Sequence, residues 1–361
     1  MGPIQRHPPA PSTPDVSGSS VSASSHELTE TPGTAAILFG RNYGVALFWL
    51  ALCVALAVAT PTFLTKVNLL DNVLNDTAIV GILAAGEAIV IIAAAIDLSV
   101  APVAALAAIV AAKLLQAGVT PVAAFTAGLS VGAAAGCLNG FIVVCMKVSP
   151  LIATLGTFSS LTGLGLIITN DAAIFGPRQS GLTIIGLDRF LGVLNPVWIL
   201  LGVFILCAAV MNWTVWGVRL KASGGNPQAA RRAGVAVGRY VWGAFIVSGI
   251  CAALGGLITL GTLSEADPTM SDSLIFDAIT AVALAGVLLT GGRGSMGRVF
   301  LGALILETID NGFTLLGISS YYQLVATGVL LVVAVWLDGF LSRAIDRRRV
   351  AGQPGPGIGP P

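Results

Sequence analysis

The segment from residue 77 to residue 96 reads TAIVGILAAGEAIVIIAAAI and holds a single charged side chain, Glu87. An apolar helix of about 20 residues rises about 30 Å, which is the thickness of the hydrocarbon core of a bilayer. Segments of this kind recur along most of the chain. The hydrophobic fraction is 55%, the charged fraction is 10% and the mean hydropathy is +0.91, whereas a soluble domain carries about 25% charged residues. The sequence therefore predicts an all-α integral membrane protein.

The apolar segments are separated by short links of polar or helix-breaking residues, so we expect a polytopic bundle of about ten transmembrane helices. The second to fifth segments are the least clearly separated, and a re-entrant or broken helix remains open there. The predicted spans are 43–62, 77–96, 101–117, 121–145, 149–169, 196–215, 240–262, 275–291, 296–316 and 321–341.

The ends of the chain differ in composition from the membrane domain, which we assign to residues 39–345. Residues 1–38 are rich in Pro, Ser and Thr without helical periodicity, and we expect them to be a disordered tail. They do not form a secretory signal, because the first apolar run begins only near Tyr43 and has the length of a full span. Residues 346–361 form the C-terminal tail.

The distribution of basic residues predicts the orientation, since Lys and Arg are retained in cytoplasmic loops. The 217–239 segment carries only bases and is expected inside, whereas the loop after the next span carries only acids and is expected outside. Continued alternation places both termini in the cytoplasm for ten spans, and an even number such as eight would do the same. The deciding residues are Arg219, Lys221, Arg231, Arg232 and Arg239 against Glu265, Asp267 and Asp272.

The polar residue types argue against several kinds of site. Both histidines, His7 and His26, lie in the N-terminal tail, and the cysteines fall in apolar segments without CxxC spacing. We therefore expect no metal site, no disulfide framework, no cofactor and no catalytic residues. The net charge of +1 gives no basic surface for nucleic acid. The cysteines are Cys53, Cys137, Cys145, Cys207 and Cys251.

Residues 224–234 read GGNPQAARRAG and predict a short helix with defined ends. Asn226 can cap its N-terminus, and Pro227 suits the first helical position because its missing N–H would be unsatisfied there anyway. Gly234 can end the helix in a left-handed conformation. Such a helix in a cytoplasmic loop presents a rigid binding surface to a partner outside the membrane. The alternative is an ordinary solvated amphipathic loop.

This run resembles the EAA loop of ABC importer membrane subunits, with Gln228 where the usual Glu stands. The wider chain, over about 65 to 345, is similar to the permease subunits of ribose, xylose and galactose importers. The stretches that carry the likeness, in the order of that family, are 95–100 (AIDLSV), 152–156 (IATLG), 223–226 (SGGN), 291–295 (GGRGS) and 317–323 (GISSYYQ).

The resemblance implies a subunit of a bacterial inner-membrane importer that translocates a monosaccharide or related polyol. Its partners would be a cytoplasmic ABC ATPase, an extracytoplasmic sugar-binding protein, a second permease subunit in a homodimer or heterodimer, and the lipid bilayer. The residues expected to couple to the ATPase are Gly224, Gly225, Asn226, Pro227, Ala229, Ala230, Arg231, Arg232 and Gly234.

Charged groups inside apolar spans are costly and by default face a cavity or a partner. Asp97 could form a polar break beside the translocation pathway, or with Ser99 it could cap the following helix. Asp310 and Asn311 adjoin near the external end of a span, where sugar hydroxyls could be contacted. The pathway candidates are Glu87, Asp97, Ser99, Asn139, Thr154, Asp277, Asp310 and Asn311.

Glycines at 132, 136 and 140 share one helical face and predict close helix packing. The glycine-rich 291–295 run lacks the lysine of a phosphate-binding loop and predicts a tight turn. ATP chemistry must then come from a separate polypeptide.

The chief rival function is an ion-coupled secondary carrier, for which the intramembrane acids would be ion sites. A membrane enzyme is a third alternative, but the sequence shows no set of catalytic residues for it.

Overall fold

The computed structural model describes residue 2 and residues 32–176, 181–269 and 272–351, with side chains from 44 to 336 apart from 177–180 and 270–272. The chain divides into two compact units, Met1–Asn42 and Tyr43–Pro361. The arrangement described below is that within the second unit. Most of both predicted tails lies outside the described residues.

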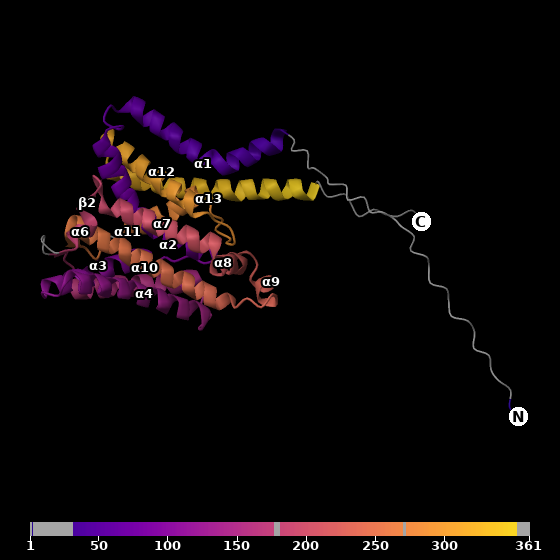
Figure 1. Ribbon diagram of the computed structural model, residues 1–361, viewed down its shortest axis with the longest axis horizontal. Coiled ribbons are helices and arrows are strands. Elements are labelled where there is room, and N and C mark those ends of the chain that lie inside the picture. Colours follow the sequence, from indigo (N-terminus) through magenta and orange to yellow (C-terminus); the bar gives the residue numbers. More distant parts are fainter. Residues whose placement is uncertain (1, 3–31, 177–180, 270–271, 352–361) are drawn as a thin grey trace. The chain divides into compact units, whose positions relative to one another are not determined.

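Helices make up most of the described chain (Figure 1). Each of the ten predicted spans overlaps one of them. Two short antiparallel strand pairs accompany the helices, namely β1 with β4 and β2 with β3. The helices are α1 Pro32–Ala59, the π-helix η1 Asn68–Val73, α2 Leu74–Ile92, α3 Val100–Gln116, α4 Pro121–Val144, α5 Pro150–Thr169, α6 Thr183–Gly186, α7 Asn195–Trp213, α8 Val215–Gly225, α9 Pro227–Arg232, α10 Val237–Leu263, α11 Asp272–Leu284, α12 Met296–Leu315 and α13 Ser320–Ala351; the strands are β1 Ile174–Phe175, β2 Arg189–Phe190, β3 Val193–Leu194 and β4 Glu265–Ala266.

Several helix ends differ from the prediction, and α13 runs to Ala351, ten residues beyond the predicted span. The first helix begins at Pro32, inside the predicted tail, and proline suits the first turn of a helix. The second gains the π-helical turn from Asn68 onward. The predicted span 275–291 is wrong at its C-terminal end: α11 stops at Leu284, since Gly286 takes a left-handed conformation with φ of 64°.

Five described helices are long and apolar enough to span a membrane. Four other helices are apolar but shorter, and the shortest of them, α11, would rise only about 20 Å. The structure therefore supports a multi-pass all-α membrane protein without confirming ten full spans. The five described helices that are long and apolar enough to cross a bilayer are Asn68–Ile92, Pro121–Val144, Pro150–Thr169, Asn195–Trp213 and Val237–Leu263.

The centre of the bundle is formed by α2 and α10. Helix α10 packs against α2, α3 and α4, and α2 is buried on all sides from Val80 to Ile92, as is typical of a helix at the centre of a bundle. The predicted glycine face of α4 is confirmed. A Cβ added at Gly132 or Gly136 would lie 2.2 Å from a backbone oxygen of α10, and one at Gly140 would lie 2.2 Å from the ring of Trp242.

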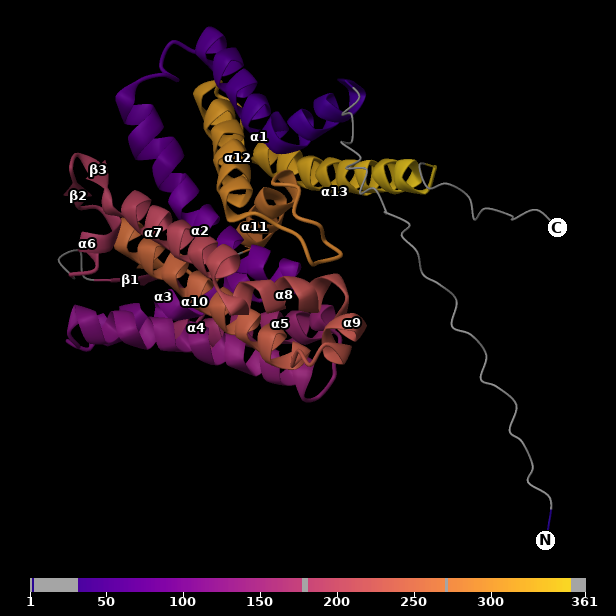
Figure 2. The same ribbon diagram turned by 45° about the vertical axis from the view of Figure 1, so that its right-hand side comes forward.

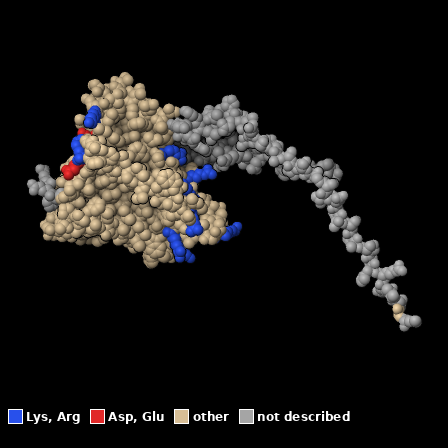
Figure 3. Space-filling view, in the orientation of Figure 1, with Lys and Arg blue, Asp and Glu red and all other residues tan. Residues whose placement is uncertain are grey.

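The two ends of the bundle carry different structures. Helices α8 and α9 lie at one end, and α6 with the β2–β3 pair lies at the other (Figures 1 and 2). Lys and Arg gather around the α8–α9 end, whereas acidic and basic side chains appear together at the opposite end (Figure 3). At that opposite end Arg189 donates to Asp71 at 2.8 Å, and this hydrogen bond raises the pKa of the Arg189 guanidinium. The contact ties β2 to η1.

Candidate functional site

The 224–234 segment has the ends that its sequence predicts. The Asn226 side chain accepts a hydrogen bond from the Ala229 amide at 2.9 Å, and Pro227 is the first residue of α9. At the other end Gly234 has a φ of 80°, its amide donates to the carbonyl of Arg231, and the Val235 amide donates to the carbonyl of Ala230. This is the Schellman pattern of helix termination. A helix of six residues is therefore fixed at both ends by local bonds.

One side of α9 is anchored and the other is free of the bundle. Ala230 is buried, while Arg231 and Arg232 are exposed in the last turn. Cations at a helix C-terminus are stabilised by the helix dipole. The segment thus presents two arginines to the surroundings from a rigid turn.

Glycines seat this segment against the bundle. Gly224, at the end of α8, lies so close to the end of α2 that an added Cβ would be 1.9 Å from the Ile92 carbonyl oxygen. The same oxygen accepts the Gly292 amide at 2.8 Å. Gly292 in turn approaches Gly225, where its own Cβ would be 2.4 Å from the Gly225 Cα. The predicted turn at 291–295 is confirmed as non-helical, and it packs on the α8–α9 junction.

Five predicted pathway residues meet in one place, here called the Asp97 network: Glu87, Asp97, Ser99, Asn139 and Thr154. It lies at the break between α2 and α3, where Ala94 has a φ of 62°. The Ser99 hydroxyl donates to Asp97 Oδ1 at 2.6 Å, and the Asn139 amide of α4 donates to the Ser99 Oγ at 2.7 Å. Asp97 itself is buried. The network therefore joins the break to a neighbouring helix.

Other helices complete the Asp97 network. From α10 the Ser248 hydroxyl donates to Asp97 Oδ2 at 2.9 Å, and from α5 the Thr157 hydroxyl donates to Asn139 Oδ1 at 2.8 Å. Thr154 reaches the carbonyl of Ile96 at 3.3 Å. Sequence reasoning missed Thr157 and Ser248, because a hydroxyl inside an apolar span has no local pattern that marks its partner.

Glu87 belongs to the same place and is fully buried. Its Oε1 accepts the Asp97 amide at 3.2 Å, while its Oε2 has no hydrogen-bond partner among the described residues. Of the two predictions for Asp97, the polar break matches the geometry. The capping alternative matches in part: Asp97 Oδ1 accepts the Ser99 amide at 3.0 Å directly before α3, whereas the side chain of the N-cap residue Ser99 makes no capping bond.

The remaining candidates lie elsewhere, near the other end of the bundle. Asn311 of α12 and Asn68 of η1 exchange two amide hydrogen bonds of 2.9 Å each. Asn72 also donates to Asn68 at 3.1 Å, and Gln323 donates to the backbone carbonyl of Asp310 at 3.1 Å. This amide pair fixes the C-terminal part of α12 against η1.

Asp277 and Asp310 are members of a set of four carboxylates that we call the Asp310 group. The other two members are Asp76 and Glu307. These acids come from α2, α11 and α12, which pack against one another. Asp76 was not predicted, because the sequence gives no sign that the start of α2 meets α11. No set of His, Cys, Asp and Glu in the described residues could hold a metal ion.

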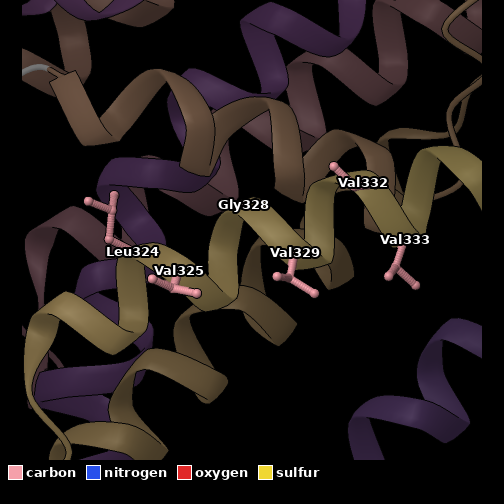
Figure 4. Close-up of a pocket in the computed structure, with 6 residues that line it drawn as sticks. All are labelled: Leu324, Val325, Gly328, Val329, Val332 and Val333. Atoms are coloured by element: carbon pink, nitrogen blue, oxygen red, sulfur yellow. The ribbon is translucent and has the colours of Figure 1, made fainter.

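Two hollows in the described part of the chain differ in their lining. One runs along α13 and is lined only by apolar groups (Figure 4), as suits a surface against lipid. A narrower one lies between α3, α10 and α11 and has Thr259 and Asp267 among its lining residues. The α13 hollow is lined by Leu324, Val325, Gly328, Val329, Val332 and Val333.

Comparison with known proteins places these features in context. Residues 69–335 match the family model described as the branched-chain amino acid transport system / permease component. The chain is 38% identical to the ribose import permease protein RbsC of Bacillus subtilis over 288 residues, covering 80% of this chain and 89% of that protein. It is 33% identical to the D-allose transport system permease protein AlsC of Escherichia coli, covering 85% and 94%. The L-arabinose transport system permease protein AraH of the same organism is 32% identical, with the same coverage. No solved structure matches the chain.

Proposed function

From the premise that this chain belongs to the family of branched-chain amino acid transport system permease components, we propose that it is the membrane-spanning subunit of an ABC importer for a neutral monosaccharide or related polyol. The relatives described above are permeases for ribose, D-allose and L-arabinose. The chain itself performs no ATP hydrolysis, since its sequence lacks a phosphate-binding loop.

The relatives favour a sugar over an amino acid as the transported solute, because each of the three is a permease for a monosaccharide. The carboxylates of the Asp310 group are hydrogen-bond acceptors, which suit a solute that offers several hydroxyl donors.

The observation that carries the coupling role is the capped helix α9 with exposed Arg231 and Arg232. We propose that it docks on a separate cytoplasmic ATPase, so that the α8–α9 end faces the cytoplasm of a bacterial inner membrane. Both termini then lie inside, in agreement with the positive-inside rule. A second permease subunit and an extracytoplasmic binding protein complete the importer.

The experiment is copurification of the ATPase from a membrane that contains the tagged chain. Reversing both charges, Arg231→Glu with Arg232→Glu, should lower the recovered ATPase and abolish ATP-driven uptake while the protein stays inserted. Arg239→Glu is the matched control, because Arg239 is also exposed and basic but lies in α10. Equal recovery and equal uptake in the double variant and the control would refute the docking role of α9.

A further inference from the structure

Helix α8 exposes apolar side chains beside the end of a membrane-spanning helix. It begins at Val215 directly after α7 ends at Trp213, and Thr214 between them interrupts the helix and caps α8. Val215 is 63% exposed and Val218 is 61% exposed. Their spacing places them on one face of the helix, and the exposed Ala222 continues that face. A helix in water would expose polar residues there, so this face suits the boundary of a bilayer.

Two tryptophans indicate where α7 meets the membrane surface. Trp198 lies in the first turn of that helix, and Trp213 is its last residue. Both are exposed, Trp213 by 85%, and tryptophan is enriched at the two interfaces of a bilayer. The exposed face of α8 therefore begins at the headgroup level, where α7 leaves the hydrocarbon core.

Two bases flank the apolar face of α8. At 3.6 residues per turn, Arg219 and Lys221 lie on opposite sides of it. Arg219 Nη1 donates to the hydroxyl of Tyr240 in α10 at 3.0 Å, and Lys221 Nζ donates to Asn212 Oδ1 in α7 at 3.1 Å. Both acceptors are neutral. The two positive charges are thus held in place by partners that do not neutralise them.

No nearby acid compensates this surface. The sequence from residue 189 to residue 264 contains no Asp or Glu, and it includes all of α7, α8, α9 and α10. Helix α8 also packs against α2, but Glu87 of α2 is buried in the Asp97 network. Neither Arg219 nor Lys221 forms an ion pair with a described residue. The α8 end of the bundle is accordingly basic (Figure 3).

The combination of groups selects the kind of ligand. Lys and Arg next to a membrane helix attract anionic headgroups, and the exposed valines can contact acyl chains. A free phosphate would use only the bases, and a neutral lipid only the valines. A lipid is favoured over a protein because this face is continuous with α7, of whose most apolar part only 33% is buried.

We propose that the exposed face of α8, with Trp213, Arg219 and Lys221, binds an anionic phospholipid of the inner leaflet. The two bases hold the phosphate, and the valines contact the upper part of an acyl chain. The site is separate from Arg231 and Arg232 of α9. It goes beyond the proposed import function and depends on it only for the side of the membrane.

The charge preference is tested by native mass spectrometry of the purified chain with phosphatidylglycerol or phosphatidylcholine at equal concentration. The native chain should bind phosphatidylglycerol more tightly. Arg219→Gln with Lys221→Gln should weaken that binding roughly thirtyfold, as two bases at a membrane surface give, and should leave phosphatidylcholine binding unchanged. Arg231→Gln with Arg232→Gln removes the same charge from α9 and is the matched control, which should keep the native preference.

The location is tested in bilayers that contain the chain, with lipids brominated on their acyl chains, because bromine quenches tryptophans that it contacts. Brominated phosphatidylglycerol should quench more than brominated phosphatidylcholine at equal mole fraction. This excess should be lost in Trp213→Phe and in Arg219→Gln with Lys221→Gln. The control Trp198→Phe should keep the excess, because Trp198 lies at the other end of α7.

Three results would overturn the site. Equal loss of phosphatidylglycerol binding in the two double variants would show attraction to any basic surface. An excess of quenching that survives Trp213→Phe would place the lipid elsewhere. Loss of the excess on adding the ATPase would assign this face of α8 to that partner. None of these measurements involves sugar uptake, so failure of the import function would leave them unchanged.

Discussion

One substitution, glycine to alanine, is expected to act with opposite sign at two helical positions of this protein. At Gly224 the new methyl group would lie 1.9 Å from the Ile92 carbonyl oxygen, and real Cβ contacts essentially never fall under 3.0 Å. Backbone on one side must therefore move by about 1 Å or more. At Gly163, in α5, no atom lies within 4 Å of the added methyl group.

The magnitudes follow from these contacts. Overpacking costs about 1–3 kcal/mol, and displacing the Ile92 carbonyl weakens its bond to the Gly292 amide by about 0.5–1.5 kcal/mol. The better helix propensity of alanine returns up to about 1 kcal/mol. Gly224→Ala should thus lower the free energy of unfolding by about 0.5–4.5 kcal/mol, whereas Gly163→Ala should raise it by up to about 1 kcal/mol.

The assay is reversible unfolding of the purified protein in mixed micelles, with both variants compared to the native chain. Because α8 leads directly into α9, Gly224→Ala should also lower ATP-driven uptake, and Gly163→Ala should not. Equal shifts in stability for the two variants would refute the close packing of α8 against α2. Normal ATP-driven uptake by the Gly224→Ala variant would show that this packing has no part in coupling to the ATPase.

Three further outcomes are expected. Asn139→Ala removes the hydrogen bonds to Ser99 and Thr157 and should destabilise the protein by about 1–3 kcal/mol, since interhelical hydrogen bonds in membranes are worth about 0.6–1.7 kcal/mol each. The control is Ser160→Ala, because the Ser160 hydroxyl bonds only to its own helix. This variant should change the free energy of unfolding by less than about 0.5 kcal/mol. Glu87→Gln keeps an acceptor for the Asp97 amide and should leave unfolding energy within about 1 kcal/mol and uptake intact, so lost uptake would contradict a structural role. The purified chain should hydrolyse no ATP in a phosphate-release assay, and turnover free of copurified ATPase would contradict the separate-ATPase proposal.

Much of the fold could be predicted because the signals are local. The apolar segments gave helices at each expected place, and the caps of α9 follow from Asn226, Pro227 and Gly234, whose preferences act within a few residues. The glycine face of α4 was likewise visible as a spacing of four residues. Each of these features depends on neighbours in the sequence alone.

What could not be predicted depends on partners distant in sequence. The end of α11 at Leu284 is set by the conformation of Gly286, although the apolar run continues beyond it. Ser248 joins Asp97 across 151 residues, and no pattern near Ser248 announces that bond. Asp76 becomes part of the Asp310 group only because α2, α11 and α12 pack together. The candidate list therefore contained two separate sites that the sequence could not tell apart.

The source of energy for uptake tests the central claim most directly. The measurement is accumulation of labelled ribose, D-allose or L-arabinose in vesicles that hold the chain with its ATPase and binding protein, at constant internal ATP, before and after a protonophore. An ABC importer should continue to accumulate sugar and should stop when ATP or the binding protein is withheld. A secondary carrier draws about 2.3 kcal/mol per charge from each 100 mV of membrane potential, so loss of accumulation on adding the protonophore, with ATP maintained, would contradict the assignment.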